Sequence, residues 1–238
     1  MATDLPEPPW RRTTSRPVKR QLSTELIVST ALDVMAKDGL DAVSMRRVAQ
    51  QLDTGAASLY AHVRNKSELH ELMYDQIMST IEVPEIDPAR WQEQLKELAR
   101  TLTKVMLDNP GVARIAMHTL IPTSPQMLMG MDRILGLLAA GGLPAKVASY
   151  VADAVALYTT AIAYEASLWS DAEGGVEEAQ RRMGQIDDYL SALPPDQLVH
   201  LRAMAPVMAA DDAAERFEFA LDLLIGGLDR YAQKPATD

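Results

Sequence analysis

The sequence has 238 residues, of which 47% are hydrophobic and 24% are charged, a composition typical of a globular protein and far from that of a disordered chain. It contains no cysteine, which excludes disulfides and thiolate metal sites. The first thirty residues lack the apolar run of a signal peptide, and the apolar stretch around 134–145 is too short to span a bilayer. We therefore expect a cytoplasmic protein with no membrane partner.

The charges are distributed unevenly along the chain. Residues 1–66 carry ten Lys and Arg against seven Asp and Glu, which gives +3, whereas the remainder has a net charge of −13. This asymmetry is typical of a polyanion-binding head on an acidic body, although chance placement of solvated charges gives the same pattern. Residues 1–22 have four prolines and no periodicity, which predicts a flexible basic arm. Its cations are Arg11, Arg12, Arg16, Lys19 and Arg20.

Two helices are predicted to follow the arm. An apolar stripe at helical spacing indicates a first helix that is capped by Ser23 or Thr24 and ends at Gly39. Ser44 then caps a second helix at 45–52, and residues 53–55 form a turn.

A short third helix is predicted at about 56–63, with Leu59 and Val63 on its inner side. Two short helices joined by a tight turn have the dimensions of a helix-turn-helix, whose second helix enters the major groove of DNA. Asn65 starts a fourth helix that runs to about residue 81, and Glu68 completes the pattern of a capping box.

The remainder is predicted to be helical, because no alternating β-branched run occurs and prolines lie at the joints. Helices are expected at about 89–108, 111–119, 124–140, 144–170, 176–191, 196–208 and 211–232. The expected fold is all-α. It has a helix-turn-helix domain at 23–66 and a helical domain at 67–238, which begins with a connector helix at 67–81.

The stretch "VSMRRVAQQLDTGAASLYAHVRNKSEL" resembles the DNA-binding head of the tetracycline-repressor family of bacterial transcription factors. The resemblance covers residues 23 to about 80. Two positions depart from the family pattern, since Asp53 stands where the turn usually has glycine and Gly55 takes the cap position of the recognition helix. The matching residues are Ser44, Arg46, Ala49, Leu52, Leu59, Tyr60, His62, Asn65, Lys66 and Leu69.

The resemblance implies roles for the outward residues of the head. Tyr60 and Lys66 are expected to contact phosphates, and Arg46 is expected to read a base, most naturally a guanine. Ser58 is the main polar reader of the third helix, and His62 is expected to contact a base or a phosphate. The alternatives are that Tyr60 packs between helices and that Arg46 is a solvated surface charge. The predicted DNA-contacting set is Arg46, Ala56, Ala57, Ser58, Tyr60, Ala61, His62 and Lys66. The cations of the basic arm are also predicted to contact DNA, by entering a narrowed minor groove.

The resemblance also implies that the body forms a dimer and binds a ligand. Helix 144–170 has alanines near one face, and two glycines fall inside the predicted helix 211–232, where each costs roughly 1 kcal/mol relative to alanine unless close packing compensates. The alternative is packing within one chain. The predicted interface residues are Ala152, Ala156, Ala163, Leu223, Gly226 and Gly227.

A methionine-rich set is predicted to line an adaptable apolar pocket, with ordinary core packing as the alternative. His118 and Glu165 lie roughly where the tetracycline repressor places metal-linked ligand contacts, but that match needs gaps, so no metal or cofactor is expected. The predicted pocket residues are Trp91, Met106, Met117, His118, Met127, Met131, Glu165 and Trp169.

Together these features predict a ligand-responsive transcriptional regulator. We expect a homodimeric repressor that binds a palindromic operator in double-stranded DNA and is released by a small, largely apolar effector. An activator of the same family and a helical adaptor without DNA binding are the alternatives. An enzyme is not expected, because the sequence has four histidines but no glycine-rich phosphate loop and no nucleophile elbow.

Overall fold

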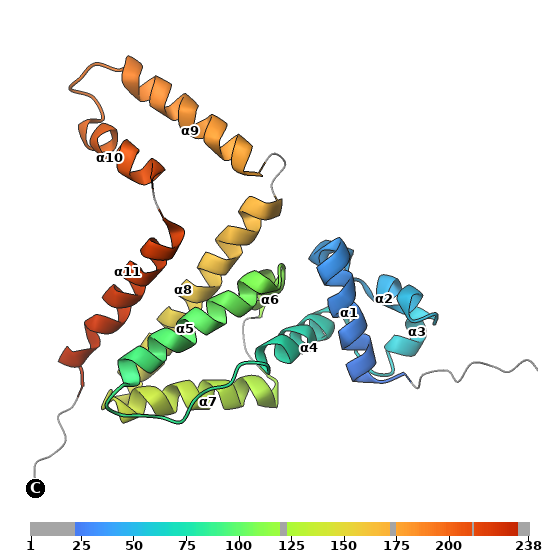
Figure 1. The fold of residues 1–238 in the computed structure, drawn as a ribbon. Helices are drawn as coiled ribbons and strands as arrows, with labels where there is room; N and C mark the ends of the chain where they lie inside the picture. The colour runs from blue at the N-terminus through green and yellow to red at the C-terminus, as the bar shows by residue number, and fades with distance from the viewer. Residues whose placement is uncertain (1–21, 120–122, 172–174, 211, 233–238) are drawn as a thin grey trace, which may run out of the picture.

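The computed structural model describes residues 22–119, 123–171, 175–210 and 212–232, and within these ranges every regular element is helical. This confirms the all-α prediction. The basic arm, with the five cations predicted to contact DNA, lies outside the described residues. Figure 1 shows a small group of helices joined by α4 (Lys66–Met78) to a larger helical body.

Side-chain caps set the ends of the helices in the small group, which we call the head. It consists of α1 (Thr24–Asp38), η1 (Leu40–Ala42), α2 (Met45–Gln51) and α3 (Ala56–Leu59). The hydroxyl of Ser23 accepts from the Leu26 N–H at 3.3 Å, and that of Ser44 accepts from the Arg47 N–H at 3.1 Å. These bonds satisfy amides that a helix leaves unpaired at its start, so both helices begin where the sequence predicts.

The third and fourth predicted helices are shorter than expected. The N–H groups of His62 and Val63 both donate to the Leu59 carbonyl at 2.9 Å, so the chain continues beyond α3 in hydrogen-bonded turns. The predicted α4 boundary at 81 is also corrected to Met78. There the hydroxyls of Ser79 and Thr80 donate to carbonyls of the last turn, at 2.8 and 2.7 Å, and thus compete with continued helical bonding.

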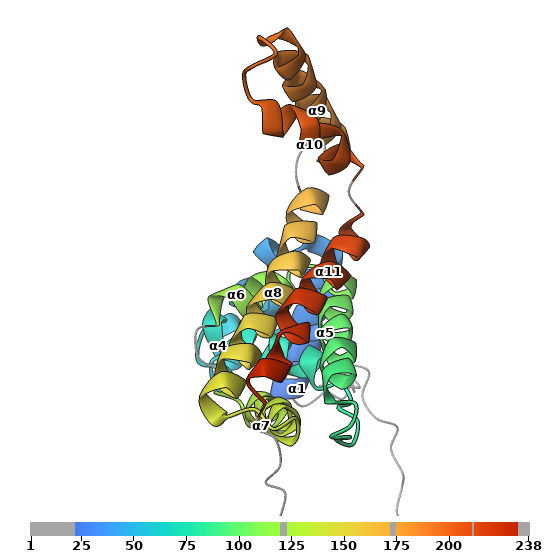
Figure 2. The ribbon, with the colours of Figure 1, turned by 90° about the vertical axis from the view of Figure 1, so that its left-hand side faces the viewer.

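The body is built around α8. Its elements are α5 (Trp91–Asp108), α6 (Val112–His118), α7 (Pro125–Ala140), α8 (Ala145–Asp171), α9 (Gly175–Ala192), α10 (Val199–Ala209), α11 (Ala213–Gly226) and η2 (Leu228–Arg230). α8 contacts α5, α6, α7 and α11, and α11 runs beside it (Figure 2). One segment of α8, Ala145–Trp169, is apolar and long enough to cross a membrane by length and composition alone. This segment is longer than the apolar stretch at 134–145. Because α8 packs against α5, α6, α7 and α11, it is the central helix of the bundle.

α9 and α10 extend beyond the rest of the body and contact each other (Figures 1 and 2). Several of their apolar side chains are exposed, among them Ile186, Tyr189, Val207 and Met208. This pair of helices therefore presents uncovered apolar surface within the single chain.

The head and the body share one hydrophobic core at their junction. Val112 and Ile115 of α6 and Ala163 of α8 belong to the same buried cluster as the interior of the head. Gly111 makes this approach possible, because its φ of 97° is in the left-handed region and a Cβ there would lie 3.0 Å from Leu40 Cβ. The Arg114 guanidinium also pairs with Asp41 of the head at 2.7 Å.

Candidate DNA-binding surface and ligand cavity

The turn between α2 and α3 has the conformation that the sequence pattern requires. Asp53 adopts a positive φ of 50°, which an aspartate tolerates better than most residues. The Thr54 N–H donates to the Ala49 carbonyl at 3.0 Å and closes the end of α2. Gly55 is the N-cap of α3 and provides no side-chain cap.

The segment from α3 to residue 63 has one buried side and one bare side. Leu59 and Val63 are 0% exposed and anchor it in the core of the head. Tyr60 is 53% exposed, and Ala57, Ser58, Ala61 and His62 are exposed as well. Ala56 departs from the predicted outward set, because it is half-buried and packs against the core of the head.

Two cations beside this bare surface have no side-chain partner among the described residues. These are Arg46 in the first turn of α2 and Lys66, the first residue of α4, and both are exposed. Their neighbours differ, since Arg47 pairs with Asp38 at 2.8 Å and Arg64 pairs with Glu68 at 3.0 Å. The predicted set therefore includes two exposed cations without an ion-pair partner in the described chain, an exposed phenol and an exposed imidazole.

The start of α4 is fixed by reciprocal capping. The Asn65 side chain accepts from the Glu68 N–H at 2.9 Å, as predicted. The Glu68 carboxylate accepts from the N–H of Arg64, one residue before the expected partner. A lysine at the first position of a helix is unfavourable next to the positive end of the helix dipole. Lys66 is therefore placed where its own helix gains nothing from its charge.

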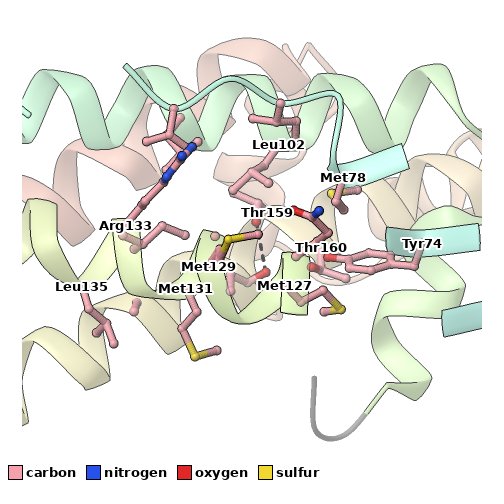
Figure 3. Close-up of a pocket in the computed structure, with 18 of the residues that line it drawn as sticks. Tyr74, Met78, Leu102, Met127, Met129, Met131, Arg133, Leu135, Thr159 and Thr160 are labelled. Carbon is pink, nitrogen blue, oxygen red and sulfur yellow. Dashed lines mark hydrogen bonds between the residues drawn. The ribbon is translucent and has the colours of Figure 1, made fainter. Parts of the chain in front are cut away.

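A cavity of about 450 Å³ lies between α4, α5, α7 and α8, next to the segment that follows α4 (Figure 3). Most of its wall is apolar, which suits a largely apolar ligand. The apolar lining consists of Met78, Ile81, Val83, Leu98, Leu102, Met106, Met127, Met129, Met131, Ile134, Leu135, Ala152 and Ala156.

The polar lining of the cavity contains one cation, Arg133. The carboxylate of Asp75 accepts from the Ser124 hydroxyl at the N-cap of α7, whereas Asp153 has no hydrogen bond or ion pair within the described chain. Tyr74 of α4 also lines the cavity, and burial raises its pKa, so the phenol is neutral near pH 7.

Three of the eight predicted pocket residues border this cavity: Met106, Met127 and Met131. The other five do not, and the prediction is corrected for them. Trp91 is buried against Gly141, where an added Cβ would lie 2.5 Å from the indole ring, so the ring fills core space. Glu165 pairs with Arg216 at 3.1 Å. Met117, His118 and Trp169 are exposed elsewhere on the body.

Sequence reasoning did not single out Tyr74, Arg133 or Thr160, although all three line the cavity. One available signal was the Thr159-Thr160 pair inside an otherwise apolar helix. Hydroxyls in such a helix need a partner, and either a backbone carbonyl or a ligand can provide one.

The residues of α8 predicted for a dimer surface contact their own chain, although Ala156 is also exposed, so their place in a dimer stays a prediction. Ala152 and Ala156 line the cavity, and Ala163 is 2% exposed in the junction core. Their small size makes room for the cavity and for α6. The outer face of α8 presents larger apolar groups, with Tyr150 62% and Leu157 55% exposed.

The end of α11 also differs from the prediction. The helix ends at Gly226 and Gly227 is its C-cap, so neither glycine lies in a helix interior. Helix endings tolerate glycine, so no close packing is needed to explain this pair. Leu223 and Phe219 of α11 are 65% and 63% exposed.

The connector helix is tied to the wall of the cavity. Besides the Asp75–Ser124 bond, the Thr123 hydroxyl donates to Glu71 of α4 at 3.2 Å. His70 lies on the same helix, and burial together with the charges of Lys66, Arg114 and His118 lowers its pKa to about 4. A displacement of the start of α7 would therefore act directly on the helix that leads to the head.

The chain is similar to known regulators along most of its length. Residues 27–73 match the family described as bacterial regulatory proteins, tetR family, and residues 83–231 match the tetracyclin repressor-like C-terminal domain. Over 92% of the chain and 81% of the relative, it is 29% identical to the HTH-type transcriptional repressor DrrR1 of Streptomyces coeruleorubidus. It is 27% identical to the tetracycline repressor protein class E of Escherichia coli, over 92% and 98% of the two chains. The chain is also similar to the TetR family protein ActR from Streptomyces coelicolor, whose structure was solved in complex with actinorhodin. The two sequences are 40% identical, and the structures superpose with a TM-score of 0.81 over 91% of this chain and 100% of ActR.

Proposed function

Because the chain belongs to the tetR family of bacterial regulatory proteins, we propose that it is a repressor that binds an operator as a homodimer and leaves it when a small, largely apolar molecule binds. The observation that carries this proposal is the bare face of the head. In a protein with a net charge of −10, Arg46 and Lys66 are exposed and unpaired beside the short helix α3. Phosphates and base edges provide the partners that these groups lack.

Arg46 and Arg47 form a matched pair for testing the DNA contact. Both lie in the first turn of α2, but only Arg47 has an ion-pair partner, Asp38. Replacing either arginine with alanine removes the same charge. We expect Arg46→Ala to cost about 1–3 kcal/mol of operator affinity and to relax the preference at one base position. Arg47→Ala should bind almost as the wild type does. The measurement is fluorescence anisotropy with the DNA upstream of the protein's own gene.

Lys66 offers a second measurement with a different signature. A phosphate contact contributes to the salt dependence of binding and not to sequence preference. We expect Lys66→Ala to lower affinity for every DNA sequence alike and to reduce the salt slope by about one per head. If the wild type showed no preference for any duplex over random DNA, the operator proposal would fail and the adaptor alternative would replace it.

The ligand part of the proposal is supported by the position of the cavity. It touches α4 directly and touches α7, which is hydrogen-bonded to α4 through Asp75 and Glu71. A ligand that prefers one arrangement of α7 and α4 shifts the population of head positions. Linkage then requires the ligand to weaken operator affinity by the same factor by which the operator weakens ligand affinity. Calorimetry on the free protein and on the operator complex measures this factor, and a ligand affinity that is the same in both would eliminate the mechanism.

The homodimer is supported by uncovered apolar surface on neighbouring helices. α8 and α11 lie side by side, with Tyr150 and Leu157 on one and Phe219 and Leu223 on the other left exposed (Figure 2). Large apolar side chains exposed on adjacent helices favour a protein–protein contact. A two-fold dimer would bring two heads to successive half-sites of a palindrome. Leu157→Glu combined with Leu223→Glu should give a monomer in sedimentation that binds a single half-site only weakly.

A further inference from the structure

Thr160 differs from the other described serine and threonine residues of α8. Ser149, Thr159 and Ser167 each donate to a carbonyl of the preceding turn, at 2.7 to 3.0 Å. Thr160 makes no hydrogen bond with the described residues, although it is only 8% exposed and the carbonyl one turn back is available to any helical threonine. Its side chain lines the cavity.

Tyr74 approaches the same place from the opposite wall. Figure 3 shows its ring pointing from α4 into the cavity toward Thr160 of α8. The Tyr74 hydroxyl also has no hydrogen-bond partner among the described residues, and it is a neutral donor because burial raises its pKa. Two hydroxyls from two helices thus line the same cavity, with the Tyr74 ring pointing toward Thr160, and each has a proton to donate. Because neither hydroxyl is bonded to the described chain, both can donate to an acceptor that enters the cavity.

The chemistry of the pair selects the kind of acceptor. A carbonyl oxygen has two lone pairs and can accept from both hydroxyls at once, without bringing a charge into an apolar cavity. The lining includes the thioethers of Met78, Met127 and Met129, and its polar groups include Asp75, Ser79 and Gln126. Arg133, the one cation of the lining, lies at the other side of the view in Figure 3.

We propose that Tyr74 and Thr160 together recognise a ketone or quinone oxygen of a largely apolar ring system, and that this contact ties the ligand to α4. The inference builds on the proposed function, since it assigns a chemical class to the effector of that cavity. It also makes Tyr74 a direct hydrogen-bonding contact between the ligand and the connector helix. Arg133 is available to an acidic group at the far end of the same molecule.

Two probes of nearly equal shape isolate the carbonyl contact: anthraquinone-2-carboxylate and anthracene-2-carboxylate. Both have three fused rings and an acid group, and only the first has ketone oxygens on the central ring. We expect the wild-type protein to bind the quinone about tenfold more tightly than the anthracene, the effect of hydrogen bonds to otherwise unpaired hydroxyls. Isothermal titration calorimetry on the full chain measures both affinities.

Three conservative variants assign the difference to residues. Tyr74→Phe and Thr160→Val each remove one donor, and each should reduce the preference for the quinone by about threefold or more while affinity for the anthracene stays the same. Thr159→Val is the matched control, because its hydroxyl lines the same cavity but already donates to Val155 and Ala156 at 2.9 and 3.0 Å. It should keep the full preference. Circular dichroism before titration verifies that each variant is folded.

The outcomes separate this inference from the proposed function. Equal affinity of the wild type for the two probes, binding of neither probe, or an unchanged preference in both donor variants overturns the role of the hydroxyl pair. Operator binding is measured without any probe, so a protein that selects its operator but ignores the quinone contradicts only the ligand class. A protein that prefers the quinone but binds no DNA selectively contradicts only the proposed repressor.

Discussion

The head and the cavity region of the body are constructed in opposite ways. In the head, Ile27, Val48, Leu59 and Val63 are each 0% exposed, and the candidate functional groups other than Ala56 lie on the outside. Around the cavity the candidate functional groups face inward, and flexible methionines form much of the wall. A close-packed core transmits motion as a unit, whereas thioethers can repack around different ligands. The head is thus suited to move as a rigid body and the cavity wall to change shape.

Truncating one leucine in each region tests this difference most strongly. Leu59→Ala empties a fully buried position, and we expect it to lower the free energy of unfolding by about 2–5 kcal/mol and to abolish operator binding. Leu102 is half-buried and borders space that is already open, so Leu102→Ala should cost less than about 2 kcal/mol. Urea titrations of both variants give the two values. Equal losses would mean that the cavity wall is as tightly packed as the head.

The joint between the regions provides the next largest effect. Gly111 has a φ of 97°, and a Cβ there would lie 3.0 Å from Leu40 Cβ and 3.3 Å from Met35 Sδ. We expect Gly111→Ala to cost about 1–3 kcal/mol, because the backbone is strained and the side chains of the head must shift. Gly130→Ala in α7 is the control, since no atom lies within 4 Å of its added Cβ. Thermal unfolding should show a lower midpoint for the first variant and an unchanged or higher one for the second.

The same comparison explains which parts could be read from the sequence. The caps Ser23, Ser44 and Asn65 bond to amides three residues away, so their pattern is local and the helix starts followed from it. The tight turn at Asp53 and the inward positions of Leu59 also follow from local geometry. Where several weak preferences compete at a helix end, as at residues 79–81, the boundary was wrong.

The cavity could not be read in the same way, because its wall comes from helices that are distant in sequence. Met106 and Met127 were placed on it, but nothing local distinguishes them from Met117, which is exposed. The burial of Trp91 depends on Gly141, fifty residues later, whose missing side chain accommodates the ring. The alanines of α8 were read as a partner surface, and the pattern gave no sign that Ala152 and Ala156 also border the cavity.

His70 gives a pH test of the junction, with a smaller effect because the residue is only half-buried. Burial, followed by the nearby charges of Lys66, Arg114 and His118, lowers its pKa from 6.5 to about 4 in the folded state. Below about pH 6.5 the unfolded chain therefore binds a proton that the folded chain does not, and the free energy of unfolding falls as the pH drops toward 4.

Between pH 6.5 and about pH 4, we expect the free energy of unfolding to fall less for His70→Gln than for the wild type. His200→Gln, at an exposed position on α10, is the control and should follow the wild type. Urea midpoints on both sides of the interval measure the difference. Parallel curves for all three proteins would show that protonation of His70 does not oppose the packing of α4.

The smallest expected effect lies on the functional surface of the head, where stability and contact with DNA are separable. Gly55 caps α3 with extended dihedrals of −81° and 145°, and no atom lies within 4 Å of an added Cβ. Gly55→Ser supplies an oxygen that can accept from the first amides of α3, for a gain of a few tenths of a kcal/mol in the free energy of unfolding.

Gly39→Ser is the matched control, because an added Cβ there is equally free of contacts but the φ of 80° strains any side chain. Differential scanning calorimetry should therefore show a higher midpoint for the change at position 55 and a lower one for the change at position 39. A loss at both positions would mean that α3 needs the freedom of glycine, and that the head is less rigid beside the DNA than its core implies.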